Sequence, residues 1–219
     1  LYTGATVSGK ILLGTGDDVA LSTAAGGFEI DGGDGNDTIA MDYTYSGDDI
    51  LSGGAGNDAI YAGSGNDQID GGADDDTLAG NDGDDLIKGG SGNDSIDGGN
   101  GIDTAVYTGT FANHGVSLNA DGSVKVNDER EASQDGTDTL RNIERLAFVD
   151  GTWTLVVGTS DGETLTGSAG NDLVFGGAGD DTFLATGGLD RYDGGDGVDT
   201  IDYSQMTFGV TVDLASGFA

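Results

Sequence analysis

A nine-residue repeat built on glycine and aspartate occupies more than half of this chain. Residues 53–106 divide without a gap into six consecutive nonapeptides: GGAGNDAIY, AGSGNDQID, GGADDDTLA, GNDGDDLIK, GGSGNDSID and GGNGIDTAV. This array extends upstream to residue 32 across a three-residue insertion, and a second array fills residues 158–202. The shared pattern is G-G-x-G-x-D-x-U-x, in which U is a large apolar residue. Such a unit cannot bury its apolar residue alone, so the repeat predicts a stacked solenoid.

The two halves of the repeat have different physical roles. The G-G-x-G-x-D half needs glycine because its backbone must reach positive φ and approach a ligand closely. The x-U-x half is long enough for a short strand that turns one side chain inward. Aspartate occupies position six of twelve units, namely Asp37, Asp49, Asp58, Asp67, Asp76, Asp85, Asp94, Asp103, Asp172, Asp181, Asp190 and Asp199.

This alternation of turn and strand predicts a metal site between neighbouring turns. Two nonapeptides make one coil, so turns two units apart lie side by side and their carboxylates face one another. A hard cation that takes six to eight oxygen ligands at ~2.3–2.6 Å fits that space, which favours Ca²⁺ over the smaller, octahedral Mg²⁺. Transition metals normally use imidazole or thiolate, and this chain has one histidine and no cysteine. The alternative, a solvated acidic linker without metal, gives no reason for Ile or Leu in every ninth position.

The nonapeptide resembles the RTX (repeats-in-toxin) family of bacterial secreted proteins. The resemblance implies an all-β fold, a parallel β-roll or right-handed β-helix-type solenoid, with calcium ions in rows along both edges. It also implies that the position-six aspartates bridge successive ions while turn carbonyls complete each coordination shell. Turns two units apart form six pairs in the first array and three in the second, so we expect about six to nine ions. The implied carbonyl donors are Gly53, Gly54, Ala55, Gly56, Gly71, Ala73, Gly89, Gly90, Ser91, Gly92, Gly176, Gly177, Ala178 and Gly179.

Several repeats depart from the pattern and predict weaker or vacant sites. Asp74 replaces the fourth-position glycine of its unit, and Asn81 replaces the second-position glycine of the next. Glu163 stands at position six of the first unit of the second array, and Thr44-Tyr45 replaces a glycine pair.

The charge of the chain agrees with a need for cations. Forty acidic and seven basic residues give a net charge of −33, and 44 of the 219 residues are glycine. This charge excludes nucleic acid and anionic membranes as partners. The absence of cysteine excludes disulfides and a thiol nucleophile. No apolar run approaches the ~18 residues of a membrane span. The composition therefore predicts disorder without calcium and order with it.

The chain divides into five segments by composition. Degenerate repeats or an N-terminal cap occupy residues 1–31, and the first array covers 32–106. Residues 107–157 carry eight acidic and four basic residues, and we expect a β-rich segment that caps the first roll. The second array covers 158–202, and 203–219 resembles the start of a second capping segment, which predicts that the chain is a piece of a longer protein.

The segment 107–157 contains a predicted β-hairpin. Residues 115–120 and 123–126 alternate in polarity around Asp121-Gly122, a dipeptide typical of tight turns. The apolar residues Leu140, Ile143, Leu146 and Phe148 fit a helix or a strand by spacing alone.

No catalytic constellation is evident, so we expect no enzyme activity from this chain. Gly158-Thr159-Ser160-Asp161-Gly162 fits the G-x-S-x-G pattern of a hydrolase nucleophile, but it lies in phase with the second array. His114 is expected to have a surface or packing role, and Trp153 a packing role.

The sequence thus predicts a non-catalytic calcium-binding domain of a larger secreted bacterial protein. By resemblance, it stays unfolded in low-calcium cytosol, passes through a type I secretion channel and folds outside the cell, as a monomer. One alternative is an accessory carbohydrate-binding module of a polysaccharide-modifying enzyme, and another is an extender of a large adhesin. An exposed aromatic or basic strip, for example around Trp153, Arg141 and Arg145, would favour the carbohydrate-binding alternative.

Overall fold

The computed structural model describes residues 10–22, 26–44, 46–130 and 134–207. The chain forms two compact units, Leu1–Gly151 and Thr152–Ala219. Strands make up nearly all the regular structure of the described residues, with one short 3₁₀ turn, η1 (Phe111–Asn113), and no α-helix. No helix in these ranges has the length and apolar character needed to cross a membrane.

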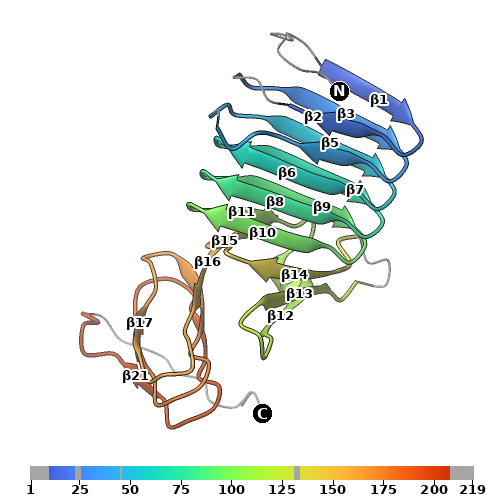
Figure 1. Cartoon of the computed structure of the whole chain (residues 1–219). Helices are drawn as coiled ribbons and strands as arrows, with labels where there is room; N and C mark the ends of the chain where they lie inside the picture. The colour runs from blue at the N-terminus through green and yellow to red at the C-terminus, as the bar shows by residue number, and fades with distance from the viewer. Residues whose placement is uncertain (1–9, 23–25, 45, 131–133, 208–219) are drawn as a thin grey trace. The chain divides into compact units, whose positions relative to one another are not determined.

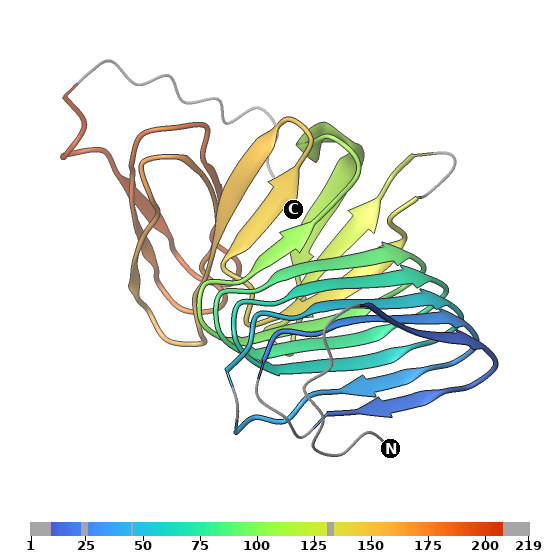
Figure 2. The same ribbon diagram turned by 90° about the horizontal axis from the view of Figure 1, so that it is seen from above.

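The first unit is a parallel β-roll, which confirms the fold class predicted from the repeat. From β1 to β11 its strands are stacked in chain order, with odd-numbered strands in one sheet, called the odd sheet, and even-numbered strands in the other, the even sheet, which β12, β13 and β14 extend (Figures 1 and 2). The odd sheet contains β1 (Lys10–Thr15), β3 (Glu29–Asp34), β5 (Ile50–Ala55), β7 (Gln68–Ala73), β9 (Leu86–Ser91), β11 (Thr104–Val106) and β15 (Arg145–Phe148). The even sheet contains β2 (Val19–Leu21), β4 (Thr38–Ala40), β6 (Ala59–Ser64), β8 (Thr77–Asp82), β10 (Ser95–Asn100), β14 (Thr137–Arg141), β13 (Val124–Asp128) and β12 (His114–Leu118).

The register of the parallel strands follows the repeat. Ile69 pairs with Ile87 in the odd sheet, and Ile60 pairs with Leu78 in the even sheet. Side chains at position eight point between the two sheets, and Ile60 and Ile87 are fully buried. Burial of an isoleucine side chain stabilises the fold by ~1.5–3 kcal/mol. The apolar core of the roll is therefore one residue wide in each strand.

Most strands of the first roll are longer than the x-U-x segment expected from the sequence, whereas β4, β11 and most strands of the second unit have the expected three residues. β7 runs from Gln68 through the next two glycines to Ala73, and β9 runs in the same way from Leu86 to Ser91. The glycines of positions one and two therefore lie in the parallel ladder, and the tight turn is confined to the residues between strands.

Residues 107–151 combine a meander with one more coil. β12 and β13 form the predicted antiparallel hairpin, and residues 119–123 connect them. β13 then pairs antiparallel with β14, and β14 pairs parallel with β10. The apolar residues that fitted helix or strand are in or next to strands, because Leu140 pairs with Ile96 and Leu146 pairs with Ala105.

An aromatic cluster fills the space beside this meander. The ring of Tyr107 stacks on that of Phe148 with centroids 5.3 Å apart, and Phe111 meets Phe148 edge-on at 5.4 Å. The imidazole of His114 lies 5.0 Å from the Phe148 ring. All four rings are buried, so this segment has a core of its own beside that of the repeats.

The second unit is a shorter roll with the same alternation. β16 (Gly151–Val157), β18 (Asn171–Phe175) and β20 (Arg191–Asp193) form one parallel row, and β17 (Thr164–Thr166), β19 (Thr182–Leu184) and β21 (Thr200–Asp202) form the other. Phe183 and Val174 are its most buried position-eight residues. Trp153 in β16 is buried, in agreement with a packing role. The expected second capping segment, 203–219, lies largely outside the described residues, which end at 207.

Candidate metal centre

Hydrogen bonds join the position-six carboxylates of neighbouring coils. The backbone N–H of Asp58 donates to Oδ1 of Asp76 at 2.8 Å, and that of Asp67 donates to Oδ1 of Asp85 at 2.8 Å. The first edge is the series of such bonds that runs from Asp18 through Asp37, Asp58, Asp76 and Asp94 to Asp138. The second edge runs from Phe28 through Asp49, Asp67, Asp85 and Asp103 to Glu144.

The second oxygen of most of these carboxylates is buried without a hydrogen-bond partner. A buried charged oxygen left without a partner is costly, and such groups are normally paired or bound to a metal. These oxygens without a partner therefore indicate cation-binding sites. They are Oδ2 of Asp18, Asp37, Asp58, Asp67, Asp76, Asp85, Asp94, Asp103 and Asp181.

Backbone carbonyls converge on the same places. A Cβ atom on Gly71 would collide with Oδ2 of Asp76 and would lie 2.5 Å from the carbonyl oxygen of Gly89, one coil further. A Cβ on Gly53 would likewise meet Oδ2 of Asp58 and the carbonyl oxygen of Gly71. At Gly53 and Gly71, a carboxylate and a carbonyl oxygen thus approach the Cα closely and leave little space for a side chain, although Ala62 and Ala185 stand at position one of their own units. This all-oxygen donor set fits calcium.

The glycines of positions two and four are required by backbone conformation. Gly54 and Gly56 both have φ of 115°, in the region that side-chain-bearing residues rarely adopt. The two substituted positions keep the same conformation, with φ of 75° at Asp74 and 79° at Asn81. Aspartate and asparagine tolerate positive φ better than other residues. The turns at Asp74 and Asn81 therefore keep the shape of the glycine turns.

The predicted carbonyl donors lie where these turns begin. Gly53 to Ala55 end β5, Gly71 to Ala73 end β7, and Gly89 to Ser91 end β9, while Gly56 and Gly92 follow the first and third of these strands. Gly176, Gly177, Ala178 and Gly179 follow β18 in the second unit.

Burial raises the pKa of the edge carboxylates. It raises the pKa of Asp67 and of Asp76 to about 7, and that of Asp94 and of Asp103 to about 6, with neighbouring carboxylates contributing in the same direction. The cause is the low polarity of the site, which disfavours the charged form. Without a cation, these groups therefore hold protons well above the usual range of aspartate.

A further ladder at position five was not anticipated from the sequence. The N–H of Asn57 donates to Oδ1 of Asn36 at 2.8 Å, and the N–H of Asn66 donates to Oδ1 of Asp48 at 2.9 Å. Position five carries Asn or Asp in most units, which is the signal that could have identified it. In the last units of the arrays it carries Ile102, Leu189 or Val198, which accept no such bond.

Three members of the two edges were also missed by the sequence analysis. Asp18 begins the first edge, in a coil whose repeat is degenerate. Asp138 and Glu144 end the two edges, although they lie inside the segment 107–157. The available signal was Gly136-Thr137-Asp138-Thr139-Leu140, which matches the G-x-D-x-U part of the repeat.

The second unit repeats the edge arrangement only in part. The N–H of Glu163 donates to Oδ1 of Asp181 at 2.9 Å, and the N–H of Asp181 donates to Oδ1 of Asp199 at 3.0 Å. Asp172 instead accepts from the backbone and hydroxyl of Ser168, at 3.0 and 2.7 Å. Asp190 accepts from the hydroxyl groups of Thr186 and Tyr192. The carboxylates of Asp172 and Asp190 are thus partly satisfied by the protein itself.

His114 belongs to a buried polar cluster. Its Nε2 lies 3.1 Å from Oδ2 of Asp135, and its Nδ1 lies 3.0 Å from the carbonyl oxygen of Thr110. Nη2 of Arg130 lies 2.7 Å from Asp128 and 2.8 Å from Asp135. Ligating atoms of His114, Asp128 and Asp135 lie within 4.8 Å of one another, but the guanidinium already supplies the positive charge there. This cluster fixes the meander by ion pairing.

The segment Gly158–Gly162 does not form a nucleophile elbow. It connects β16 to the three-residue strand β17, and the hydroxyl of Thr159 bonds to Glu163. A nucleophile elbow needs a helix after the turn, and none follows within the described residues.

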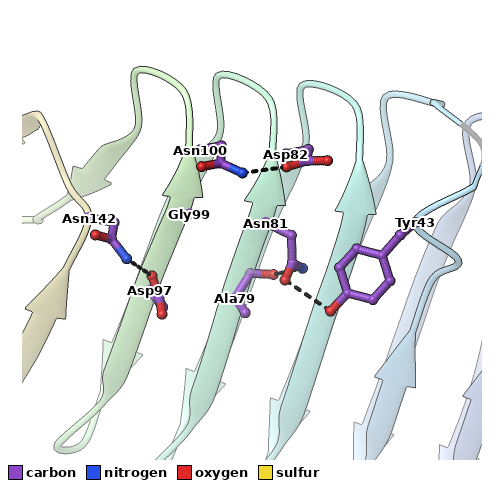
Figure 3. A pocket seen from close by; sticks show the side chains of 8 residues that line it. All are labelled: Tyr43, Ala79, Asn81, Asp82, Asp97, Gly99, Asn100 and Asn142. Atoms are coloured by element: carbon purple, nitrogen blue, oxygen red, sulfur yellow. Dashed lines mark hydrogen bonds between the residues drawn. The ribbon is translucent and has the colours of Figure 1, made fainter.

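A polar groove of about 320 Å³ lies on the even sheet, outside the two edges (Figure 3). The ring of Tyr43 stands at one end, where its hydroxyl donates to Oδ1 of Asn81 at 3.1 Å. The groove is otherwise lined by Ala79, Asp82, Asp97, Gly99, Asn100 and Asn142.

Comparison with known proteins identifies the repeat. The family model described as the RTX calcium-binding nonapeptide repeat (4 copies) matches residues 29–40, 43–78, 70–105, 157–192 and 175–201, which together are more than half of the chain. No curated protein matches. The crystal structure of the extracellular lipase LipA from Serratia marcescens is similar over 67% of this chain, with 22% sequence identity and a TM-score of 0.38. The similar region spans 27% of the lipase chain.

Proposed function

Because the chain belongs to the family defined by the RTX calcium-binding nonapeptide repeat, we propose that it is a non-catalytic domain that folds when it binds calcium outside the cell. The observation that carries this proposal is the row of buried, unpartnered Oδ2 atoms along both edges of the first roll. A folded roll without cations would hold these carboxylates close together in a poorly solvated place. The same residues in an unfolded chain would be hydrated and far apart.

The residues that would hold calcium are the position-six carboxylates and the turn carbonyls between neighbouring coils. When bound, Ca²⁺ supplies the positive charge that the edges lack. Each site that binds only the folded state stabilises it by ~2.7 kcal/mol when the free ion exceeds its Kd a hundredfold. Extracellular modules typically bind with Kd of ~10⁻⁴–10⁻³ M, so the sum over about six to nine coupled sites determines whether the roll folds.

The family resemblance supports a biological role for this dependence. The chain stays unfolded where calcium is scarce, passes through a type I secretion channel, and folds as part of a larger secreted bacterial protein. The buried carboxylates supply the mechanism, because they penalise folding until calcium is available. We propose that any catalytic activity of that larger protein resides outside this chain.

Circular dichroism during a calcium titration tests this function. In EDTA we expect little strand signal, and in millimolar Ca²⁺ a cooperative gain of strand structure. Mg²⁺ at equal concentration is the matched control, because the ion prefers a smaller octahedral shell and should leave most of the signal unchanged. Complete strand structure in EDTA, unchanged by calcium, would contradict the proposal.

Carbohydrate binding is a second candidate, and the groove beside Tyr43 favours it. Of the strip expected around Trp153, Arg141 and Arg145, Trp153 is buried and the guanidinium of Arg141 pairs with Asp121, so only Arg145 is exposed without an ion pair to another described residue. Tyr43, in contrast, is 60% exposed beside a row of amide and carboxylate groups. An aromatic face next to polar side chains suits a neutral sugar ring. A glycan array with the wild type and Tyr43→Ala in calcium tests this candidate. Equal signals from both proteins would exclude the groove as a sugar-binding site.

A further inference from the structure

The edges of the first roll do not end with the last matched nonapeptide. The matched repeats of the first array end at residue 105, yet Asp94 and Asp103 each bond to a carboxylate beyond it. The N–H of Asp94 donates to Oδ1 of Asp138 at 3.0 Å, and the N–H of Asp103 donates to Oε2 of Glu144 at 2.8 Å. Both acceptors come from the coil formed by β14 and β15, which follows the hairpin β12–β13.

The oxygen arrangement at the end of the second edge repeats that of the coil before it. A Cβ on Gly80 would meet Oδ2 of Asp85 and the carbonyl oxygen of Gly98. One coil further, a Cβ on Gly98 would meet Oδ2 of Asp103 and the carbonyl oxygen of Asn142. The carbonyl of Asn142 thus takes the place of a position-one glycine carbonyl, and Oδ2 of Asp103 is buried without a partner.

The turn that carries Glu144 is shorter than a repeat turn, and the longer side chain compensates for this. Arg141 pairs with Asp97 in the parallel ladder. Five residues separate Asp97 from Asp103, but only two separate Arg141 from Glu144. Glutamate has one more methylene group than aspartate, so its carboxylate still reaches the N–H of Asp103. The shortened turn brings fewer carbonyl groups, so a cation there has fewer protein ligands.

The first edge ends on a turn that keeps a glycine at positive φ, although at a smaller angle than in the repeats. Gly136 has φ of 66°, and its Cα approaches the carbonyl oxygen of Gly92 as position-four glycines do. Asp138 is buried, and burial raises its pKa to about 8. The buried hydroxyl of Tyr107 lies beside the Asp138 carboxyl without a hydrogen bond of normal geometry. Oδ2 of Asp94 is also buried and unpartnered.

Contacts on the same coil hold these ligands in place without neutralising them. The side chain amide of Asn142 donates to Oδ1 of Asp97 at 2.7 Å, which fixes the position of the Asn142 backbone (Figure 3). The N–H groups of Gln134 and Asp135 donate to Asp128, which fixes the turn before Asp138. Among the described residues, neither Asp138 nor Glu144 forms an ion pair with a basic side chain.

We propose that the coil formed by β14 and β15 completes two further calcium sites, one between Asp94 and Asp138 and one formed by Asp103, Asn142 and Glu144. This inference rests on the proposed function and extends it to a segment outside the matched repeats. Calcium at these sites ties β14, and through it the hairpin β12–β13, to the last coil of the array. The folding of the hairpin is therefore coupled to calcium, although β12 and β13 carry no repeat.

Calcium stoichiometry of the full chain and its variants tests the proposal. Equilibrium dialysis with ⁴⁵Ca²⁺ compares the wild type with Asp138→Asn and Glu144→Gln, both of which keep the oxygen that accepts the backbone hydrogen bond. We expect each variant to bind about one ion fewer per chain, and the Glu144 site to be the weaker one. Asp121→Asn, in the turn of the β12–β13 hairpin, is the matched control. Asp76→Asn, inside the array, is the positive control.

Hydrogen exchange supplies a second readout. In the wild type, calcium should slow the exchange of β12 and β13 amides together with that of β6 and β8. In Asp138→Asn, the calcium-dependent protection of β12 and β13 should fall, while that of β6 and β8 persists.

The outcomes distinguish the two terminal sites from calcium binding by the array. Wild-type stoichiometry and meander protection in both variants, alongside a lower stoichiometry in Asp76→Asn, would overturn the terminal sites and leave the array sites intact. Absence of calcium binding by the wild type would instead overturn the proposed function itself. If Asp138→Asn does not fold in calcium, Glu144→Asp decides: its shorter side chain should lose the terminal ion of the second edge, and an unchanged ion count would overturn that site.

Discussion

The backbone N–H of Asp58 donates a 2.8 Å hydrogen bond to Oδ1 of Asp76, whose Oδ2 is buried without a partner. One carboxylate therefore has two tasks, which can be separated by mutation. Oδ1 connects neighbouring coils through a neutral donor. Oδ2 carries charge that only a cation can balance.

Asp76→Asn should have opposite effects in the presence and absence of calcium. The amide keeps an oxygen for the N–H of Asp58 but removes the buried charge, so in EDTA the variant should retain at least as much strand structure as the wild type. In calcium it lacks a charged ligand, and its folding midpoint should shift to ~3–10-fold higher Ca²⁺. Circular dichroism during calcium titration measures both, with Asp121→Asn as control. A variant with less strand structure than the wild type in EDTA, and also a higher calcium midpoint, would contradict the division of tasks.

Gly71→Ala should destabilise the calcium-bound roll strongly. The added Cβ would collide with Oδ2 of Asp76 and approach the carbonyl oxygen of Gly89, so we expect the free energy of unfolding to fall by about 2–3 kcal/mol, although Ala62 and Ala185 stand at the same position of their units. Gly122→Ala is the control, because Gly122 has φ of 81° with open space around it and should cost only about 1 kcal/mol. Thermal unfolding in saturating calcium compares the two variants. Equal losses of unfolding free energy would show that the structure relaxes to relieve the collision at Gly71.

The metal-free chain should gain structure as the pH falls from about 7 to 4. The pKa of Asp67 and of Asp76 is about 7 in the fold, well above the ordinary aspartate value of 3.8. Between these values the folded state holds more protons than the unfolded state, so stability falls as pH rises and is greatest near pH 4. Circular dichroism in EDTA at pH 4.5 and 7.5 measures this. A stronger strand signal at pH 7.5 would reverse the expected sign.

Protons should also compete with calcium at the same carboxylates. The calcium concentration at the folding midpoint should rise as the pH falls below about 7, because Asp67 and Asp76 must then lose a proton to bind. A midpoint independent of pH between 5 and 8 would show that these groups are not ligands.

Ile87→Ala should destabilise the roll far more than Ile50→Ala. Ile87 at position eight is fully buried between the sheets, whereas Ile50 at position seven is 49% exposed. Denaturant unfolding in calcium should show a loss of about 2–4 kcal/mol in the free energy of unfolding for Ile87→Ala. For Ile50→Ala the loss should be less than about 1 kcal/mol. Similar losses at both positions would contradict a core that is one residue wide.

The repeat determined the alternation of strands, the pairing of units in register, the buried position-eight residues and the row of position-six aspartates. These features need only contacts between identical units, so the period in the sequence dictates them. For Asp58 and Asp76, the sequence was sufficient to place one carboxylate beside the other.

Only the tertiary structure decided where the edges end. Asp138 lies 44 residues beyond Asp94 in the chain, and the intervening meander hides the repeat spacing. Glu144 belongs to a shortened turn, and its role depends on the reach of one additional methylene group. The reason is physical: position in a solenoid follows from the stacking of backbone onto the preceding coil, so a residue can join the edge without belonging to the repeat.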